Sequence, residues 1–277
     1  MVPLLALTHV DKSFGGGLWR RRRVAAVVDV SFSLPGSAPE ILTIVGQSGS
    51  GKSTLARLIL GLERPTAGSL SLMGEDIGQL SRHHRRRFMG LVQPIFQNPF
   101  EAFNPLRHLD HYLFLTARRF GGASDFAEAQ ALTAAALMKV GLSLSEVARR
   151  YPHELSGGQL QRLAIARALL AKPRLIVADE PVSMLDASLR MAVVTLFKTL
   201  RSELGISIIY ITHDLATAYV VSDRILILRR GQVVESGDAR QVLTAPQHPY
   251  SRQLKDAVLV PPAATAVAGA AARAPSR

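Results

Sequence analysis

Short apolar runs alternate with longer helix-forming stretches along most of this chain. In the N-terminal quarter, runs rich in aliphatic residues predict strands at 4–10, 24–34, 41–45 and 69–73, with a helix at 52–61. The C-terminal half predicts, in chain order, a helix at 157–170, a strand at 174–178, a helix at 187–204, a strand at 206–211, a helix at 214–221 and a hairpin of strands at 224–229 and 232–236. Strands that alternate with helices favour an α/β fold with a mainly parallel sheet covered on both faces.

The segment between these two parts has a different pattern. Alanine-rich stretches at 108–120 and 125–140 predict helices, so we expect a helical insertion subdomain over about residues 98–155. One domain is expected over residues 1–260, followed by a disordered tail at 261–277, where Ala, Pro and Arg show no periodicity. No apolar run approaches the roughly 18 residues that a membrane-spanning helix requires.

Charge and composition exclude some classes of function but do not identify one. The net charge is +12, and basic clusters occur at 20–23 and 83–87. Such a surface is either an ordinary solvated face or one that attracts nucleic acid or an anionic membrane. Aromatic residues make up only 6% and do not interleave with these clusters, which argues against stacking on single-stranded nucleic acid. The absence of cysteine excludes disulfides, thiolate metal sites and an iron–sulfur centre.

The segment from Gly46 to Ser53 matches the phosphate-binding pattern G-x-x-x-x-G-K-[ST] in full. It has the required context, because an apolar strand precedes it and a helix follows it. Glycines let backbone N–H groups turn inward around phosphate oxygens, and the helix N-terminus adds partial positive charge. Lys52 is expected to reach the β- and γ-phosphates, and Ser53 to hold Mg²⁺. The predicted nucleotide-binding residues here are Gly46, Gln47, Ser48, Gly49, Ser50, Gly51, Lys52, Ser53 and Thr54.

A second apolar strand, 175–178, ends in two carboxylates, Asp179 and Glu180. The carboxyl end of a parallel strand lies beside the phosphate loop, where Asp179 can support Mg²⁺. Glu180 is then placed to act as the general base on an attacking water. A nucleoside triphosphate and Mg²⁺ are therefore the expected ligands.

The sequence LSGGQLQRLAIARAL, from Leu155 to Leu169, resembles the signature of ATP-binding cassette (ABC) proteins. This resemblance implies a P-loop NTPase core with a mainly parallel sheet, an N-terminal antiparallel β part and a helical insertion. Independently of it, Ser156 is a suitable cap for a helix whose N-terminus could approach an anion. In the family, the signature of one subunit contacts ATP bound to its neighbour, which assigns Ser156, Gly157, Gly158 and Gln159 to nucleotide binding.

The resemblance assigns further residues one by one. Gln97 resembles the glutamine that contacts Mg²⁺ or water, and His213 resembles the histidine that contacts the γ-phosphate. Asp186 ends Ser183–Asp186, which resembles the D-loop although Met184 departs from the usual SALD. Phe14 resembles the aromatic residue that stacks on adenine, with core packing as the alternative. Pro94 lacks the N–H of a ladder donor, so its strand is expected at an edge or bulge.

Two further stretches narrow the resemblance within the family. Residues 96–105 (FQNPFEAFNP) and 248–254 (HPYSRQL) resemble segments of the ATPases of oligopeptide, dipeptide and nickel importers. The expected function is then ATP hydrolysis that drives peptide uptake, with nickel or opine-like solutes as other cargoes. An ABC exporter ATPase and a soluble ABC ATPase acting on ribosomes or DNA are the alternatives.

The implied partners are a second ABC ATPase in a head-to-tail dimer, identical or paralogous, and two membrane permease subunits. An extracytoplasmic solute-binding protein would take part indirectly, and no nucleic acid is expected. The implied location is peripheral, on the cytoplasmic face of the inner membrane.

Overall fold

The computed structural model describes residues 2–15 and 23–259. Its strands form a four-stranded antiparallel sheet of order β2-β1-β4-β5 and a six-stranded sheet of order β10-β9-β3-β8-β7-β6. In the larger sheet β9, β3, β8, β7 and β6 run parallel, and β10 pairs antiparallel with β9. The strands are β1 (Leu5–Phe14), β2 (Val24–Leu34), β3 (Ile41–Val45), β4 (Ala67–Leu72), β5 (Glu75–Asp76), β6 (Val92–Ile95), β7 (Leu175–Asp179), β8 (Ser207–Thr212), β9 (Arg224–Arg229) and β10 (Gln232–Asp238).

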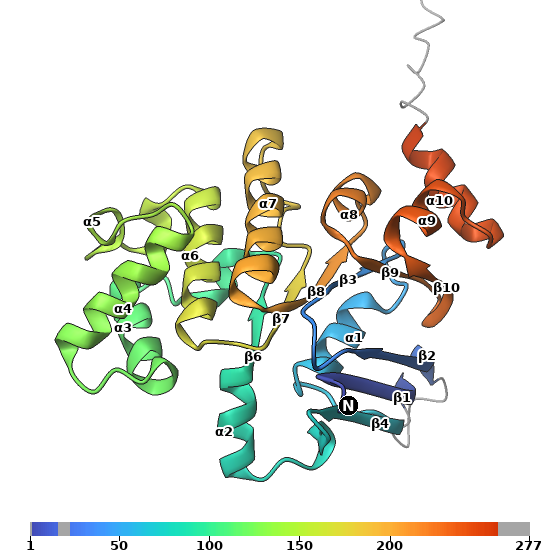
Figure 1. Cartoon of the computed structure of the whole chain (residues 1–277), viewed down its shortest axis with the longest axis horizontal. Helices are drawn as coiled ribbons and strands as arrows, with labels where there is room; N and C mark the ends of the chain where they lie inside the picture. The colour runs from blue at the N-terminus through green and yellow to red at the C-terminus, as the bar shows by residue number, and fades with distance from the viewer. Residues whose placement is uncertain (1, 16–22, 260–277) are drawn as a thin grey trace, which may run out of the picture.

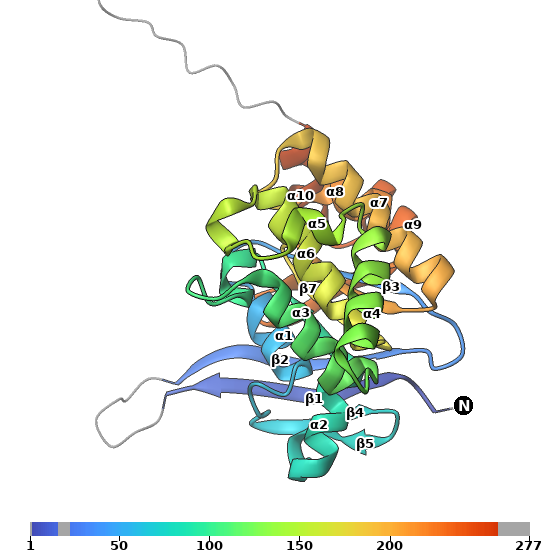
Figure 2. The same ribbon diagram turned by 90° about the vertical axis from the view of Figure 1, so that its left-hand side faces the viewer.

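Helices cover the larger sheet and extend beyond one of its edges (Figure 1, Figure 2). Helices α3 to α6 gather on the β6 side of the molecule, while α8, α9 and α10 lie at the β9–β10 side (Figure 1). The α-helices are α1 (Lys52–Ile59), α2 (Arg82–Leu91), α3 (Leu109–Thr116), α4 (Phe126–Lys139), α5 (Leu144–Val147), α6 (Gly157–Leu170), α7 (Ala187–Leu204), α8 (Leu215–Val221), α9 (Ala239–Thr244) and α10 (Pro249–Leu259). The shorter turns are η1 (Ile77–Gln79), η2 (Pro99–Ala102), η4 (Pro152–Glu154) and the π-helical η3 (Ala117–Gly121).

The larger sheet is buried on both faces, as its continuous apolar strands require. All five residues of β3 are buried, which is typical of a central parallel strand. Leu42 and Ile44 join a core with α1 and the antiparallel sheet, whereas Ile41 faces the core that includes α6 and α7. Successive side chains of β3 point to opposite faces of the sheet, so this strand contributes to both cores. The same strand leads into the phosphate loop.

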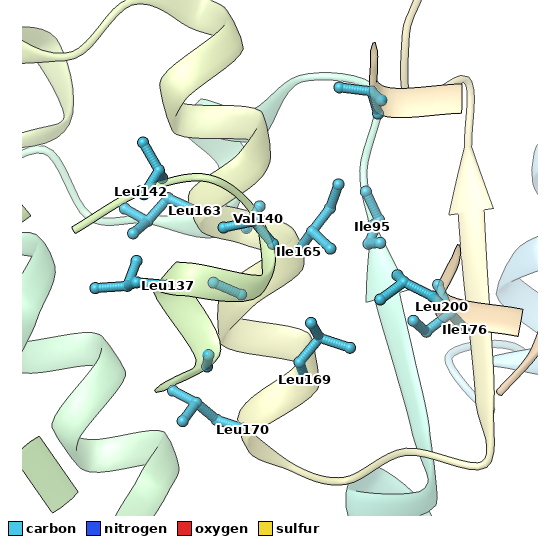
Figure 3. Packing of buried hydrophobic residues seen from close by; sticks show 14 of the residues in the cluster. Ile95, Leu137, Val140, Leu142, Leu163, Ile165, Leu169, Leu170, Ile176 and Leu200 are labelled. Carbon is cyan, nitrogen blue, oxygen red and sulfur yellow. The ribbon is translucent and has the colours of Figure 1, made fainter. Parts of the chain in front are cut away.

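Helix α6 connects the helical region to this sheet. Figure 3 shows Leu163 on the side of Leu137 in α4, while Ile165 points toward Ile95 of β6. All four side chains are buried in one cluster. Because α6 is packed on both sides, the sequence at its N-terminus has a fixed place relative to the sheet.

The predicted elements of the core and the mainly parallel sheet are confirmed, with small shifts at their ends. Pro94 lies in β6, which pairs only with β7 among the described strands, so the expected edge position is also confirmed. The sequence prediction missed α2, because basic residues obscure its apolar periodicity. Ser81 caps this helix, since its hydroxyl accepts a hydrogen bond from His84 N–H at 3.4 Å. Most of the first basic cluster and the predicted tail lie outside the described residues.

Over the described ranges, none of the helices combines the length and apolar character required to cross a bilayer.

Candidate functional site

The phosphate loop connects β3 to α1 at the carboxyl edge of the larger sheet. Gly49 and Gly51 adopt positive φ values of 76° and 105°, in the left-handed region that favours glycine. A Cβ on Gly51 would lie 2.2 Å from the carbonyl oxygen of Ala26 in β2. The second glycine of the motif is therefore required by its backbone conformation and by the close approach of a neighbouring strand.

Lys52 begins α1 and lies buried beneath the loop. Its ammonium donates to the carbonyl oxygens of Gly46 at 2.7 Å and Gln47 at 3.0 Å. Burial lowers the pKa of Lys52, and the carboxylates of Glu180 and Asp179 oppose that effect. The loop thus encloses a desolvated cation, which is a strong attractor for phosphate oxygens.

Glu180 and His213 are joined by a side-chain to side-chain hydrogen bond within the site. They follow the ends of the adjacent strands β7 and β8, and Glu180 N–H donates to Ile211 O at 2.9 Å. The Nδ1–H of His213 donates to Glu180 Oε1 at 2.9 Å. The Glu180 side chain is mostly buried and His213 mostly exposed, so the imidazole covers the carboxylate toward the open cleft. Glu180 also has a positive φ of 47°, a conformation that is uncommon outside glycine.

Asp179 lies one residue earlier and faces a separate recess. Burial raises the pKa of its carboxyl, while a hydrogen bond with the Ser53 hydroxyl acts in the opposite direction. Ser53, Gln97 and Asp179 all line this recess of about 400 Å³, and Ser53 and Gln97 also line the main cleft. Hydroxyl, amide and carboxylate oxygens are the hard donors that Mg²⁺ prefers, so these residues fit the expected metal.

The main cleft has a volume of about 810 Å³ and lies over the loop. It brings together most of the predicted residues, namely Gly46, Gln47, Ser48, Gly49, Gly51, Lys52, Ser53, Thr54, Gln97, Glu180 and His213. Ser50 is buried within the loop instead of lining the cleft. One end of the cleft is apolar, formed by Val24, Ala25 and Ala26 of β2 with Leu215, Leu254 and Ala257. The sequence prediction missed this apolar end because no motif marks it.

Phe14 lies at the end of β1, outside the described lining of the cleft. Its ring is partly exposed, and the Lys12 ammonium lies 4.9 Å from the ring centroid. Its strand partner Val24 does line the cleft. The adenine-stacking role of Phe14 stays a prediction, and the same holds for the roles given to the other site residues.

The signature residues occupy a different part of the surface. Ser156 caps α6 by accepting from Gln159 N–H at 3.2 Å, and the Gln159 side chain accepts from Ser156 N–H at 3.0 Å. Gly158 packs against α7, where a Cβ would lie 2.8 Å from Leu189. Asp186 is at the start of α7. The described residues that line the main cleft include none of Ser156–Gln159 and not Asp186.

A strand–loop–helix phosphate cradle after β3, with carboxylates at the end of β7 in the same sheet, defines a P-loop nucleotide-binding protein. The profile of the ABC transporter family matches residues 27–183, which is more than half of the chain. The chain therefore belongs to the ABC transporter family, whose nucleotide-binding subunits are ATPases.

Known proteins agree with this assignment. The oligopeptide transport ATP-binding protein OppF of Haemophilus influenzae is 41% identical over 85% of this chain and 70% of its own length. The probable peptide ABC transporter ATP-binding protein y4tS of Sinorhizobium fredii is 42% identical over 88% of this chain and 68% of its own length. The solved dimer of the ATP-binding cassette MJ0796 bound to ADP and Pi has a TM-score of 0.74 and 29% identity, covering 85% of this chain and 99% of that structure. The curated relatives are thus somewhat longer than the matched part of this chain.

The half-buried carboxyl group of Asp179 predicts a specific dependence of stability on pH. Because its pKa is raised on folding, the folded state holds this proton more tightly, and stability is lost as pH rises through the raised value. Asp179→Asn should therefore raise the melting temperature of the nucleotide-free protein at pH 7. The gain should shrink as pH falls toward the ordinary Asp value of 3.8, where the wild-type carboxyl is protonated. Asp256→Asn on the surface of α10 is the control, and an equal gain at all pH values would contradict the assignment.

Proposed function

We propose that this chain is the ATP-hydrolysing subunit of an ABC importer for peptides or similar small solutes. The observation that carries the proposal is the Glu180–His213 pair, which faces the same cleft as Lys52 and the phosphate loop. The names of the relatives, which are oligopeptide and peptide transport ATPases, support the importer class over an exporter or a soluble ATPase. The stretches at 96–105 and 248–254 support it independently.

The proposed chemistry follows from the positions of the charged groups. Lys52 neutralises phosphate charge, and the Glu180 carboxylate accepts a proton from the water that attacks the γ-phosphate. His213 donates to Glu180 and is exposed to the cleft, so it orients the carboxylate and meets the γ-phosphate. Ser53, Asp179 and Gln97 would hold Mg²⁺, which when bound supplies further charge neutralisation at the β- and γ-phosphates.

Glu180→Gln tests the base directly. The amide keeps a hydrogen-bonding side chain but cannot accept the proton, so turnover should fall by about 10²–10⁴-fold while ATP binding is retained. Phosphate release and the calorimetric Kd of ATP measure the two effects separately. Glu203→Gln, on the exposed side of α7, should change neither quantity. Near-normal turnover in Glu180→Gln would rule out Glu180 as the base.

We also propose that each site is completed by a second ATPase subunit arranged head to tail. The signature does not line the described cleft of its own chain, yet it presents an exposed helix N-terminus, a good place for an anion. A Cβ on Gly157 would have no atom within 4 Å, so this surface is open for a partner's ATP. The related cassette MJ0796 is a dimer in its ADP- and Pi-bound structure, which supports the same arrangement here.

Gly157→Asp separates the dimer requirement from folding. The site has room for the side chain, and an acidic residue in the first turn of α6 should stabilise the helix. The same charge would repel the γ-phosphate of the partner's ATP. We expect stability at or above that of the wild type and an unchanged Kd for ATP in the monomer, but loss of ATP-induced dimerisation in light scattering and loss of turnover. Gly157→Ala is the uncharged control; normal turnover of Gly157→Asp would contradict the head-to-tail site.

Permease subunits are proposed to dock on an apolar groove beside Gln97. The groove, of about 310 Å³, lies between α2, α3 and β6 and includes Phe96, the neighbour of Gln97. Its rim exposes Leu62, Met89 and Leu115 to solvent. Apolar exposure of this kind at the junction of sheet and helical region suits a partner helix. A shift in docking can then bias the equilibrium between open and ATP-closed dimers. This contact would place the chain at the cytoplasmic membrane face as a peripheral subunit.

Met89→Glu tests the docking surface. Met89 is 51% exposed on α2, so the charge should be tolerated in the isolated subunit. Basal ATP hydrolysis should stay within about twofold, whereas copurification with the permease and peptide uptake should be lost. The matched control is Met138→Glu on α4, which is 75% exposed and does not line the groove. Uptake that is equally reduced in both variants would count against this surface.

A further inference from the structure

The phosphate loop is bound to a helix near the end of the described chain. The backbone N–H of Gln47 donates to the phenol oxygen of Tyr250 at 3.2 Å, across 203 positions of sequence. Tyr250 lies in α10 and is buried. Its ring packs in a cluster that includes Val45, the residue immediately before the loop. The same side chain therefore belongs to the cluster around the end of the strand that leads into the loop, and it contacts the first turn of the loop directly.

Tyr250 is itself held in a defined position. The Arg229 guanidinium lies 4.8 Å from the centroid of its ring, and Tyr250 N–H donates to His248 Nδ1 at 3.1 Å. The Glu235 carboxylate in β10 accepts from the N–H groups of Gln247 at 2.7 Å and His248 at 3.1 Å. These contacts fix the start of α10 to the edge of the larger sheet. The phenol oxygen is thus presented to the loop by a rigid support.

Helix α10 also forms part of the cleft. Leu254 and Ala257, one and two turns beyond Tyr250, line its apolar end. The helix therefore touches the nucleotide site at two places, through a hydrogen bond to the loop and through an apolar wall. Helix α10 thus forms part of the cleft wall in addition to packing against the sheet.

We propose that Tyr250 is a positioning residue that holds the phosphate loop in its ATP-binding shape by accepting the hydrogen bond from Gln47 N–H. It acts through the loop and does not touch the reacting atoms. Without this acceptor, the first turn of the loop has more conformations to lose when ATP binds. This loss of conformational entropy destabilises the ATP-bound ground state and the transition state equally. It therefore weakens ATP binding and leaves the rate of the chemical step unchanged. The inference rests on the proposed function, since it concerns the same ATP site.

Tyr250→Phe isolates the hydroxyl because it keeps the ring and its contact with Arg229. Loss of one hydrogen bond of about 1 kcal/mol predicts a Kd and a KM for MgATP about fivefold higher, with kcat within about twofold. The full chain is titrated with MgATP by calorimetry, and phosphate release gives KM and kcat. Tyr219→Phe, which removes a solvent-exposed phenol hydroxyl from α8, is the matched control and should leave all three values unchanged.

The melting temperature without nucleotide separates positioning from simple stability. If Tyr250→Phe lowers the melting temperature but leaves Kd and KM at wild-type values, the hydroxyl is only structural and the inference is overturned. A large fall in kcat with unchanged KM would overturn it as well. Absence of MgATP binding by the wild-type chain would instead overturn the proposed function, and the two failures are therefore distinguishable.

Discussion

The burial of the Lys52 ammonium beneath the phosphate loop is the constraint on which the rest of the site depends. A cation in this place is satisfied in part by loop carbonyls, at Gly46 and Gln47, and burial still lowers its pKa. Burial also disfavours the charged form of the nearby Asp179 carboxyl, and for an acid this raises the pKa. The site thus places charged groups where water solvates them poorly. In the proposed function, phosphate oxygens and Mg²⁺ would be the partners of these groups, and their binding would offset the cost of burying them.

The described lining of the main cleft does not include the signature residues. The loop, Glu180 and His213 share a cleft, whereas the signature at the start of α6 lies elsewhere. Helix α6 is packed between the sheet and the helical region, which holds the signature in place relative to its own cleft. If the signature binds a partner's nucleotide, as proposed, hydrolysis would depend on a second subunit. The groove proposed to receive the permease adjoins the same helical region, so it would connect the nucleotide site to that partner.

The C-terminal helix adds a third element to this arrangement. Tyr250 and Glu235 connect the sheet edge to the phosphate loop by a chain of hydrogen bonds. The loop is therefore supported from both ends of the sequence, by Ala26 of β2 against Gly51 and by α10 against Gln47. Such support limits the conformations that the loop can adopt before ATP arrives.

The sequence by itself determined the α/β class, the phosphate loop, the carboxylates after 175–178 and the edge position of Pro94. These features follow from local chemistry: glycines that permit positive φ, apolar strands that must be buried, and a proline that cannot donate. The tertiary structure alone decided that Ala26 approaches Gly51, that His213 pairs with Glu180, and that Tyr250 reaches Gln47. It also showed that α2 is a helix and that Phe14 lies outside the cleft lining. Contacts between residues far apart in the chain depend on how the sheets and helices pack. No local sequence pattern specifies which distant residues this packing brings together.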